Sequence, residues 1–255
     1  MANQEKPVTI VTGAAGGIGM ALVQRLCSRG ERVVLVDRDL AALQQVANRL
    51  ELGEGNSLLI AADVSREDDV RNYVTGTLER FGRIDGFANN AGIEGATALI
   101  EEQSVEMFDK VYAVNVRGVF MGLKYVLPVM KRQGKGAVVN MSSLAGISAG
   151  PRLSPYIMSK HAVIGLTRTA AAEAAGDGIR VNAVLPGAIN TQMMRRIECD
   201  SGDAQALRSA NTGATPMGRL GEPEEVAALV AFLLSDEASY ITSSMYTIDG
   251  GMSVF

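Results

Sequence analysis

Short apolar runs alternate along this chain with longer amphipathic stretches, and this alternation limits the possible folds more than any other feature. Several of the runs are apolar at successive positions, as strands are when both of their faces are buried. They lie at residues 8–11, 33–36, 58–61, 84–88, 137–141, 181–185 and 245–248. Helical periodicity fills the intervals between them, for example at residues 21–29, 40–50, 68–81 and 224–234. The pattern predicts an α/β fold with a parallel sheet and helices on both of its faces.

The bulk properties fit one domain spanning residues 1–255, because 47% of the 255 residues are hydrophobic and no linker or charge block divides the chain. The net charge is −4 and the Lys and Arg residues are dispersed, so we expect no nucleic-acid partner. The longest apolar run, residues 226–234, is about half as long as a membrane span, and the first residues lack the apolar core of a signal peptide. Cys27 and Cys199 form neither a disulfide framework nor a metal-ligand cluster. We therefore expect a cytoplasmic protein with reduced thiols, no membrane partner and no metal site.

Residues 188–216 interrupt the alternation, because they contain helical sequence with methionine and polar residues but no clear strand. They follow directly on a predicted strand end, where parallel sheets bind their ligands. Long insertions at such places are frequently lids. We predict a substrate lid over residues 188–216, with a plain surface helical hairpin as the alternative.

A glycine-rich turn, Gly13-x-x-x-Gly17-Ile18-Gly19, follows the first predicted strand and opens the first helix. Glycines let the backbone turn tightly and approach a pyrophosphate closely, and the helix N-terminus offers N–H groups and a positive dipole end to the anion. The spacing differs from the usual G-x-G-x-x-G, so the turn alone is weak evidence. Its place between a strand and a helix predicts a dinucleotide site.

Asp37 ends the second predicted strand, eighteen residues after Gly19. A carboxylate there accepts hydrogen bonds from the adenosine ribose hydroxyls and repels a 2′-phosphate, which favours NAD over NADP. Arg38 follows directly, and it could instead bind a 2′-phosphate or stack on adenine. We predict NAD as the cofactor, because no second basic residue lies in the glycine turn.

Two more strand ends can line the same cleft. Asp63 ends the third predicted strand and could accept a hydrogen bond from the adenine amino group, while Val64 covers the ring. The alternative role, as N-cap of the next helix, is assigned to Ser65, with Asp68 at the N3 position. The fourth strand ends on amide and small residues that form either the cleft wall or an ordinary turn: Asn90, Ala91 and Gly92.

Tyr156 and Lys160 are four residues apart in a helical stretch, so they share one face of the helix. A free tyrosine has a pKa of about 10 and is a poor base at neutral pH, but a nearby ammonium group favours the phenolate. The phenolate can take a proton from an alcohol, and the phenol can return it in the reverse reaction. Ser143, after the fifth predicted strand, can bind the substrate oxygen. These residues predict a proton-transfer site in which Lys160 also holds the nicotinamide ribose; ordinary surface helix residues are the alternative.

Asn115 lies in a helical pattern at residues 111–120, where an asparagine is mildly unfavourable. It either supports packing or makes a water-mediated link to Lys160. Together, the motifs described so far, Asn115 and the stretch at residues 179–187 closely resemble the short-chain dehydrogenase/reductase family in its single-domain form.

The resemblance implies a Rossmann-type, doubly wound sheet of seven parallel strands in one domain. It implies a catalytic tetrad of Asn115, Ser143, Tyr156 and Lys160, in which Tyr156 is the acid/base. It implies a homotetramer built from long helices near residues 105–132 and 154–176 and from C-terminal segments. It also implies that residues after the sixth strand contact the nicotinamide half of NAD: Pro186, Gly187, Ile189 and Thr191.

The chain departs from the family at two places. Near the last strand it has Thr242-Ser243 where a Thr-Gly pair is frequent, and we expect this to alter the turn. Before the Asn-Ala-Gly turn it has Phe87 and Ala88 where smaller or branched residues are frequent. Neither departure touches the tetrad.

The substrate is expected beside Ser143 and Tyr156. Ile147 and Met193 predict an apolar wall, although the methionines of the lid could equally serve only to dock it. Glu94 could recognise a second hydroxyl group, as in a diol or a sugar.

We predict an NAD(H)-dependent oxidoreductase that interconverts a secondary alcohol and a ketone. The first alternative is an NADPH-dependent biosynthetic reductase such as a 3-ketoacyl-carrier-protein reductase, against which Asp37 argues. The second is a non-catalytic dinucleotide-sensing protein, which would need the glycine turn but not Tyr156 and Lys160.

Overall fold

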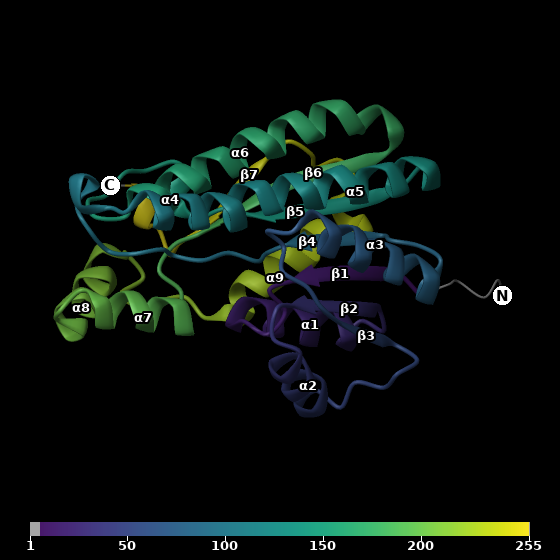
Figure 1. The fold of residues 1–255 in the computed structure, drawn as a ribbon, viewed down its shortest axis with the longest axis horizontal. Helices are drawn as coiled ribbons and strands as arrows, with labels where there is room; N and C mark the ends of the chain where they lie inside the picture. Colours follow the sequence, from purple (N-terminus) through teal and green to yellow (C-terminus); the bar gives the residue numbers. More distant parts are fainter. Residues whose placement is uncertain (1–5, 255) are drawn as a thin grey trace.

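The computed structural model describes residues 6–254 and contains one sheet in which all neighbouring strands are parallel. The strand order is β3-β2-β1-β4-β5-β6-β7, as expected for a Rossmann-type sheet (Figure 1). The strands are β1 (Val8–Thr12), β2 (Arg32–Asp37), β3 (Ser57–Ala61), β4 (Gly86–Asn89), β5 (Gly136–Met141), β6 (Ile179–Pro186) and β7 (Met245–Ile248). The predicted fold class is confirmed.

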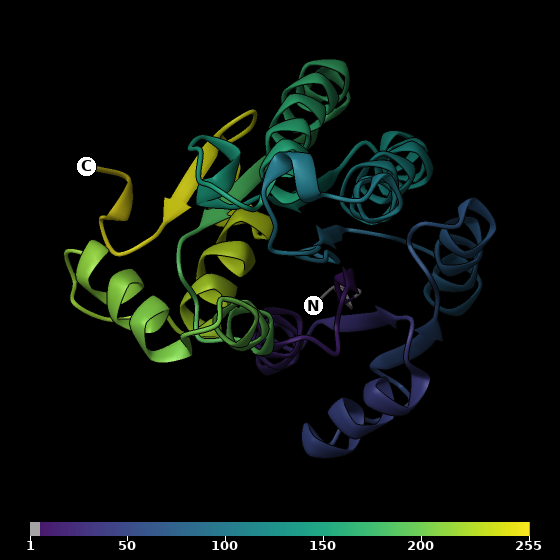
Figure 2. The same cartoon turned by 60° about the vertical axis from the view of Figure 1, so that its left-hand side comes forward.

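Helices cover both faces of the sheet (Figures 1 and 2). One face packs against α3 (Glu67–Phe81), α5 (Gly118–Gln133) and α6 (Ser154–Ala174). The other packs against α1 (Gly17–Ser28), α2 (Leu40–Arg49) and α9 (Pro223–Leu234). Within β1, Ile10 is buried in the first core and Val11 in the second. This two-sided burial is why the strands read as continuous apolar runs.

The remaining helices surround the carboxyl ends of the strands. α4 (Val105–Tyr112) leads through a π-helix, η2 (Ala113–Arg117), into α5. The predicted lid contains α7 (Gln192–Asp200) and α8 (Ala204–Ala214), which lie together on the left of Figure 1. Short 3-10 turns complete the chain: η1 (Ile100–Glu102), η3 (Leu144–Gly146), η4 (Ala175–Asp177), η5 (Asp236–Ala238) and η6 (Met252–Val254).

The predicted cap of the third helix is wrong by one residue. α3 begins at Glu67, so Arg66 occupies the N-cap position and makes no side-chain cap. Ser65 instead donates to Asp63, through both its N–H (2.9 Å) and its hydroxyl (2.7 Å). At N3, Asp69 accepts from the Asp63 N–H at 2.9 Å. The Asp63 carboxylate accepts the hydrogen bonds of Ser65, so the Ser65 hydroxyl forms this local turn and does not cap the helix.

Both departures from the family have a visible structural consequence. Ser243 has φ 60°, in the left-handed region that favours glycine. Phe87 is fully buried, and a Cβ at Gly122 would lie 2.8 Å from a Phe87 ring atom. Gly122 therefore provides the space that the large side chain needs.

Candidate active site

The ends of β1 and β4 form the centre of the site. These strands are adjacent, and the sheet order reverses between them, which is where doubly wound sheets bind nucleotides. The Thr12 hydroxyl accepts from the N–H groups of Asn90 (3.0 Å) and Ala91 (3.1 Å), while Asn90 Nδ2 donates to the Thr12 carbonyl at 2.9 Å. Asn90 therefore joins the two strand ends and fixes the floor of the cleft.

The glycine turn leaves room for an anion at the start of α1. Gly13 has φ 66°, and a Cβ there would lie 2.9 Å from the Ala91 Cα. A Cβ at Gly19 would lie 2.1 Å from the Gly13 carbonyl oxygen, so this contact also requires glycine. The N-cap residue is Gly16, so no side chain caps the helix. The uncapped N-terminus and the side-chain-free turn fit the pyrophosphate of a dinucleotide.

The adenosine side of the cleft is formed by the ends of β2 and β3. Asp37 Oδ2 accepts from the Ala15 N–H at 3.2 Å, which brings this carboxylate against the glycine turn. Arg38 is exposed beside it. One carboxylate oxygen of Asp63 accepts the two hydrogen bonds from Ser65. Val64 lies against the start of α5, where a Cβ at Gly118 would be 3.1 Å from Val64 Cγ2.

The segment after β6 leads into the lid beside the glycine turn. The Gly187 N–H donates to the Ile248 carbonyl at 3.0 Å, and Ile189 is buried and pairs with Gly221. Thr191 caps α7 by accepting from the Met194 N–H at 3.2 Å, and a Cβ at Gly17 would lie 3.4 Å from its methyl group. The N-termini of α1 and α7 therefore meet at one place in the cleft, directly after the Pro186–Gly187 strand end.

Tyr156 and Lys160 extend from α6 toward the end of β5. Lys160 is buried; its Nζ donates to the Met141 carbonyl at 2.9 Å and lies 5.4 Å from the centre of the Tyr156 ring. The Ser143 hydroxyl acts on Tyr156 by lowering its pKa, and it donates to the Pro186 carbonyl at 3.4 Å. Ser142 anchors the same helix turn by donating to the Lys160 carbonyl at 2.9 Å. A hydroxyl pair thus stands beside a buried cation.

Burial perturbs both titrating groups. It lowers the pKa of Lys160 from 10.5 to about 8, because the charged ammonium is removed from water. It also raises the pKa of Tyr156, an effect opposed by the nearby Ser143 hydroxyl and reinforced by the negative charge of Glu94. The expected lowering of the tyrosine pKa by Lys160 is therefore not found in the cofactor-free protein, because removal of the phenolate from water is the larger effect.

Asn115 lies in the π-helix and holds the loop that follows β4. Its Oδ1 accepts from the Ile93 N–H, and its Nδ2 donates to the Ile93 carbonyl, both at 2.8 Å. Nδ2 also donates to the Ser159 hydroxyl at 3.0 Å, which in turn donates to the Tyr156 carbonyl at 2.7 Å. The π-helix is a local distortion that often marks functional positions. Ser159 was not predicted, although its place three residues after Tyr156 on a buried face was a usable signal.

Asn115 and Lys160 approach each other around Gly92. A Cβ at Gly92 would lie 3.3 Å from Asn115 Oδ1 and 3.5 Å from Lys160 Nζ. The expected water-mediated link between the two side chains stays a prediction, but the glycine gives both of them access to the same space.

The substrate-side residues are spread over three segments. Glu94, after β4, forms an ion pair with Arg196 of α7 at 2.6 Å, and no motif in the sequence indicates this partner. Ile147 follows η3 and is exposed, and Met193 is half-buried in the first turn of α7. The neighbouring Met194 accepts from Asn211 of α8 (Nδ2 to Sδ, 3.7 Å), so this methionine joins the two helices of the predicted lid to each other.

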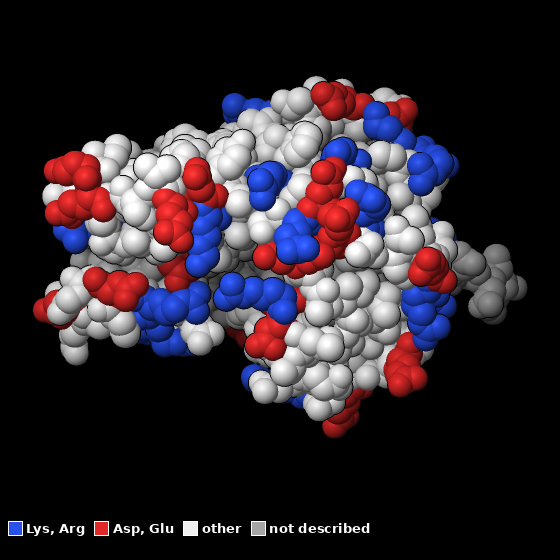
Figure 3. Space-filling model, viewed as in Figure 1, with Lys and Arg blue, Asp and Glu red and all other residues white. Residues whose placement is uncertain are grey.

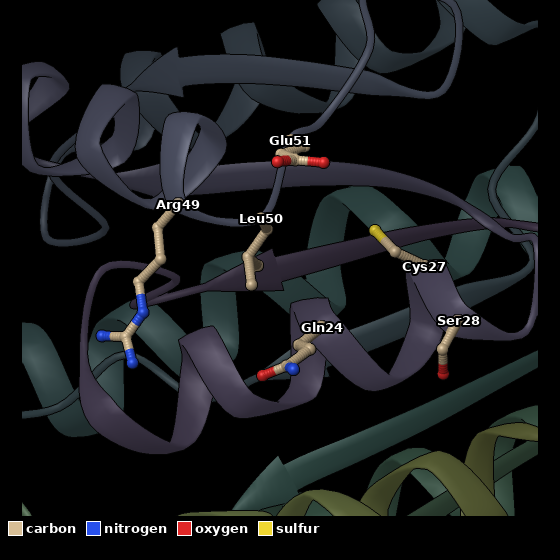
Figure 4. A pocket seen from close by; sticks show the side chains of 6 residues that line it. All are labelled: Gln24, Cys27, Ser28, Arg49, Leu50 and Glu51. Carbon is tan, nitrogen blue, oxygen red and sulfur yellow. The ribbon is translucent and has the colours of Figure 1, made fainter.

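A hollow of about 410 Å³ lies outside this site, between the last turn of α1 and the end of α2 (Figure 4). Cys27 lines it, and burial together with Glu31 raises the pKa of its thiol to about 11. A thiol with that pKa is protonated at neutral pH and is a weak nucleophile. The hollow therefore offers no reactive group, in agreement with the interpretation of Cys27 as a plain reduced thiol.

The charges on the surface do not form a binding stripe on the face shown in Figure 3, where acidic and basic side chains are interspersed. Among residues 6–254, none of the helices has the length and apolar character required to span a membrane.

Comparison with known proteins identifies the family. The sequence model described as enoyl-(acyl carrier protein) reductase matches residues 13–253. Levodione reductase of Leifsonia aquatica is 45% identical over 250 residues, which are 96% of this chain and 94% of that protein. This chain belongs to the short-chain dehydrogenase/reductase family. Cyclohexanol dehydrogenase of Acinetobacter sp. (strain SE19) is 39% identical over 243 residues, which are 95% of this chain and 93% of that protein.

Solved structures agree with this assignment. The crystal structure of levodione reductase has a TM-score of 0.94 at 43% identity and covers 97% of this chain and 98% of its own. NAD⁺-bound xylitol dehydrogenase has a TM-score of 0.93 at 34% identity and covers 98% of this chain and 100% of its own. The relatives of this short-chain dehydrogenase/reductase are thus dehydrogenases and reductases named for alcohol and ketone substrates.

Proposed function

We propose that this protein is an NAD(H)-dependent oxidoreductase that interconverts a secondary alcohol and a ketone, with Tyr156 as the general acid/base. The observation that carries the proposal is the buried ammonium of Lys160, whose Nζ lies 5.4 Å from the centre of the Tyr156 ring. The nearby Ser143 hydroxyl lowers the pKa of Tyr156. The proposed members of the tetrad come from the π-helix, the segment after β5 and α6.

In alcohol oxidation, Ser143 holds the substrate oxygen and Tyr156 receives its proton. The nicotinamide of NAD, when bound, supplies the hydride acceptor. Lys160 donates to the Met141 carbonyl and is available to the nicotinamide ribose, and its positive charge favours the phenolate. In ketone reduction, Tyr156 returns the proton to the same oxygen. Asn115 positions the loop after β4 and the first turns of α6.

The cofactor proposal is NAD, held by three groups of residues. Gly13, Gly17, Ile18 and Gly19 would hold the pyrophosphate, and Pro186, Gly187, Ile189 and Thr191 the nicotinamide half. Asp37 would accept from the adenosine ribose, with Arg38 on its open side and with Asp63, Val64, Asn90, Ala91 and Gly92 along the cleft. The position of Asp37 at the end of β2, against the glycine turn, supports NAD over NADP.

The substrate proposal is a neutral secondary alcohol or ketone of cyclohexanol size, bound between Ser143, Tyr156 and the lid at residues 188–216. The names of the relatives support a ring-shaped carbon skeleton. Ile147 and Met193 would form the apolar wall, and Glu94 would stand near a second polar group.

One alternative is favoured by a specific observation. Arg38 is exposed beside Asp37 and could bind a 2′-phosphate, and one relative, 38% identical over 250 residues, is a 3-oxoacyl-(acyl-carrier-protein) reductase of Thermotoga maritima. An NADPH-dependent ketoreductase acting on a carrier-bound acyl chain would use the same tetrad. NADPH and acyl thioester would then be turned over faster than NADH and a cyclic ketone.

We also propose a homotetramer in the cytoplasm. Apolar side chains are exposed on α4 and α5, among them Phe108, Tyr112 and Phe120, and apolar surface of this kind supports contact with a second copy of the chain. Light scattering after size exclusion should give four times the mass of one chain. Phe120→Glu should lower that mass, and a monomeric wild type would contradict the proposal.

The proposed activity is tested with Tyr156→Phe. We expect this variant to bind NADH as the wild type does, by fluorescence titration, and to lose at least about 10³-fold in turnover with a panel of cyclic ketones, because the proton donor is gone. Tyr125→Phe on α5 is the matched control and should keep its turnover. A Tyr156→Phe variant with near wild-type rates would exclude Tyr156 as the acid/base.

A further inference from the structure

An ion pair connects the lid to the opposite wall of the cleft. Arg196 of α7 approaches Glu94 through two atoms, with Nε 2.6 Å from Oε1 and Nη2 3.4 Å from Oε2. The Glu94 side chain is only 12% exposed, whereas that of Arg196 is 51% exposed. Other polar contacts fasten the lid at its base, for example Asn190 with Glu222. The pair with Glu94 instead spans the cleft, from the middle of α7 to the loop after β4.

The loop that carries Glu94 is rigidly connected to the acid/base. Ile93, the residue before Glu94, is gripped at both its N–H and its carbonyl by the Asn115 amide. The same amide donates to Ser159, which donates to the Tyr156 carbonyl. Hydrogen bonds and the peptide bond between Ile93 and Glu94 therefore connect Arg196 to the helix turn of Tyr156.

We propose that the ion pair between Glu94 and Arg196 holds the lid closed over the substrate pocket. We also propose that Glu94 is a positioning residue, through which closure of the lid changes the protonation of Tyr156. The proposal rests on the proposed function of Tyr156 as acid/base. This role explains why a mostly buried carboxylate lies in a pocket expected to hold a neutral substrate, because the lid supplies Arg196 as its partner.

The electrostatics of the pocket support this coupling. The groups facing Tyr156 are Lys160 on its own helix, Ser143 after β5 and Glu94 after β4, and the Glu94 charge raises the pKa of Tyr156. Arg196 faces Glu94 and, on its own helix, Asp200. With the lid closed, Arg196 offsets the Glu94 charge, so the phenolate needed for oxidation is less disfavoured. With the lid open, Glu94 is unpaired and the phenol is retained.

The test uses two variants that break the same contact but leave opposite charges. Arg196→Met leaves the Glu94 carboxylate unpaired, and Glu94→Gln leaves the Arg196 cation unpaired. The kcat/KM for oxidation of cyclohexanol with NAD should rise with pH as Tyr156 loses its proton. We expect this rising limb of the pH profile of kcat/KM to move to higher pH in Arg196→Met and to lower pH in Glu94→Gln. The shift should be about half a pH unit or more in each case. The double variant should return it to near the wild-type position.

Conservative and neighbouring variants separate the charge effect from damage to the fold. Arg196→Lys should keep the wild-type limb, and Arg195→Met, which removes only a contact to Asn190, should do the same. Hydrogen exchange, which requires no substrate, should show faster exchange of the α7 amides in Arg196→Met and Glu94→Gln than in Arg195→Met. Unchanged α7 exchange would overturn the proposal that the ion pair holds the lid closed.

The two proposals fail in different ways. If both limbs move in the same direction, or neither moves, while Tyr156→Phe is inactive, the coupling is wrong and the acid/base assignment stands. If Tyr156→Phe turns over normally, the proposed function itself is wrong.

Discussion

Lys160 should destabilise the cofactor-free protein, so replacing it should raise the stability while removing the activity. Its only hydrogen-bond partner among the described residues is the Met141 carbonyl, and no carboxylate forms an ion pair with it. The lowering of its pKa from 10.5 to about 8 means that the folded protein disfavours the charged form of Lys160 by about 3 kcal/mol of free energy at neutral pH, relative to the unfolded chain. Methionine has a similar length and no charge, so it would remove this cost. Loss of the hydrogen bond to the Met141 carbonyl would offset about 1 kcal/mol of the gain in stability. We expect the free energy of unfolding of Lys160→Met to be about 2 kcal/mol higher than that of the wild type at pH 7.

The gain should depend on pH in a defined direction. Above about pH 8, Lys160 loses its proton in the folded wild type but keeps it in the unfolded chain up to about 10.5, so the wild type becomes more stable as the pH rises through this interval. By pH 10, the advantage of Lys160→Met should fall to about zero.

The measurement is urea unfolding of the cofactor-free proteins at pH 7, 8, 9 and 10, at one fixed protein concentration so that subunit association does not bias the comparison. Lys110→Met, at an exposed position of α4, is the control and should change the free energy of unfolding by less than about 0.5 kcal/mol. The reasoning is refuted if Lys160→Met is less stable than the wild type at pH 7, or if its gain is the same at pH 7 and pH 10.

Two further predictions concern the cofactor and the turn before β7. Asp37→Ala should raise the ratio of kcat/KM with NADP to that with NAD by about tenfold or more, because it removes both a ribose acceptor and a negative charge; Asp39→Ala, which only uncaps α2, should leave the ratio unchanged, and an unchanged ratio in Asp37→Ala would contradict the NAD assignment. Ser243→Gly should stabilise the protein by about 0.5–1 kcal/mol in a thermal melt, because it relieves a left-handed serine at some cost in unfolded-chain entropy. Ser239→Gly, at φ −58°, should instead destabilise it, and a loss in both variants would show that Ser243 is unstrained.

The fold could be predicted because its signals are local and repeated. Burial of both faces produces continuous apolar strands, and each of the seven predicted runs overlaps a strand of the structure. The pairing of Tyr156 with Lys160 is equally local, since four residues in a helix always bring two side chains to one face. The glycine turn could be recognised for the same reason, as its residues are consecutive.

The contacts that complete the site could not be predicted from the sequence. Glu94 and Arg196 are separated by more than a hundred positions, and no spacing rule connects them. The π-helix around Asn115, and the hydrogen bonds of its amide with Ile93 and Ser159, are not revealed by a helical pattern in the sequence. The pKa of Tyr156 moved opposite to expectation because its sign depends on burial, which exists only once α6 is packed.

The two charges near Tyr156 explain why the site is built from an unpaired lysine and a paired glutamate. A carboxylate bound to Lys160 would stabilise the fold, but it would also cancel the positive charge that favours the phenolate. Within residues 6–254, the Lys160 ammonium has only the Met141 carbonyl as its hydrogen-bond partner, at the cost in stability described above. Glu94 would have the opposite effect on Tyr156, and its charge is offset by Arg196 from the lid. If Tyr156 is the acid/base, as proposed, the phenolate would therefore be less disfavoured with Arg196 paired to Glu94 than with α7 away from the pocket.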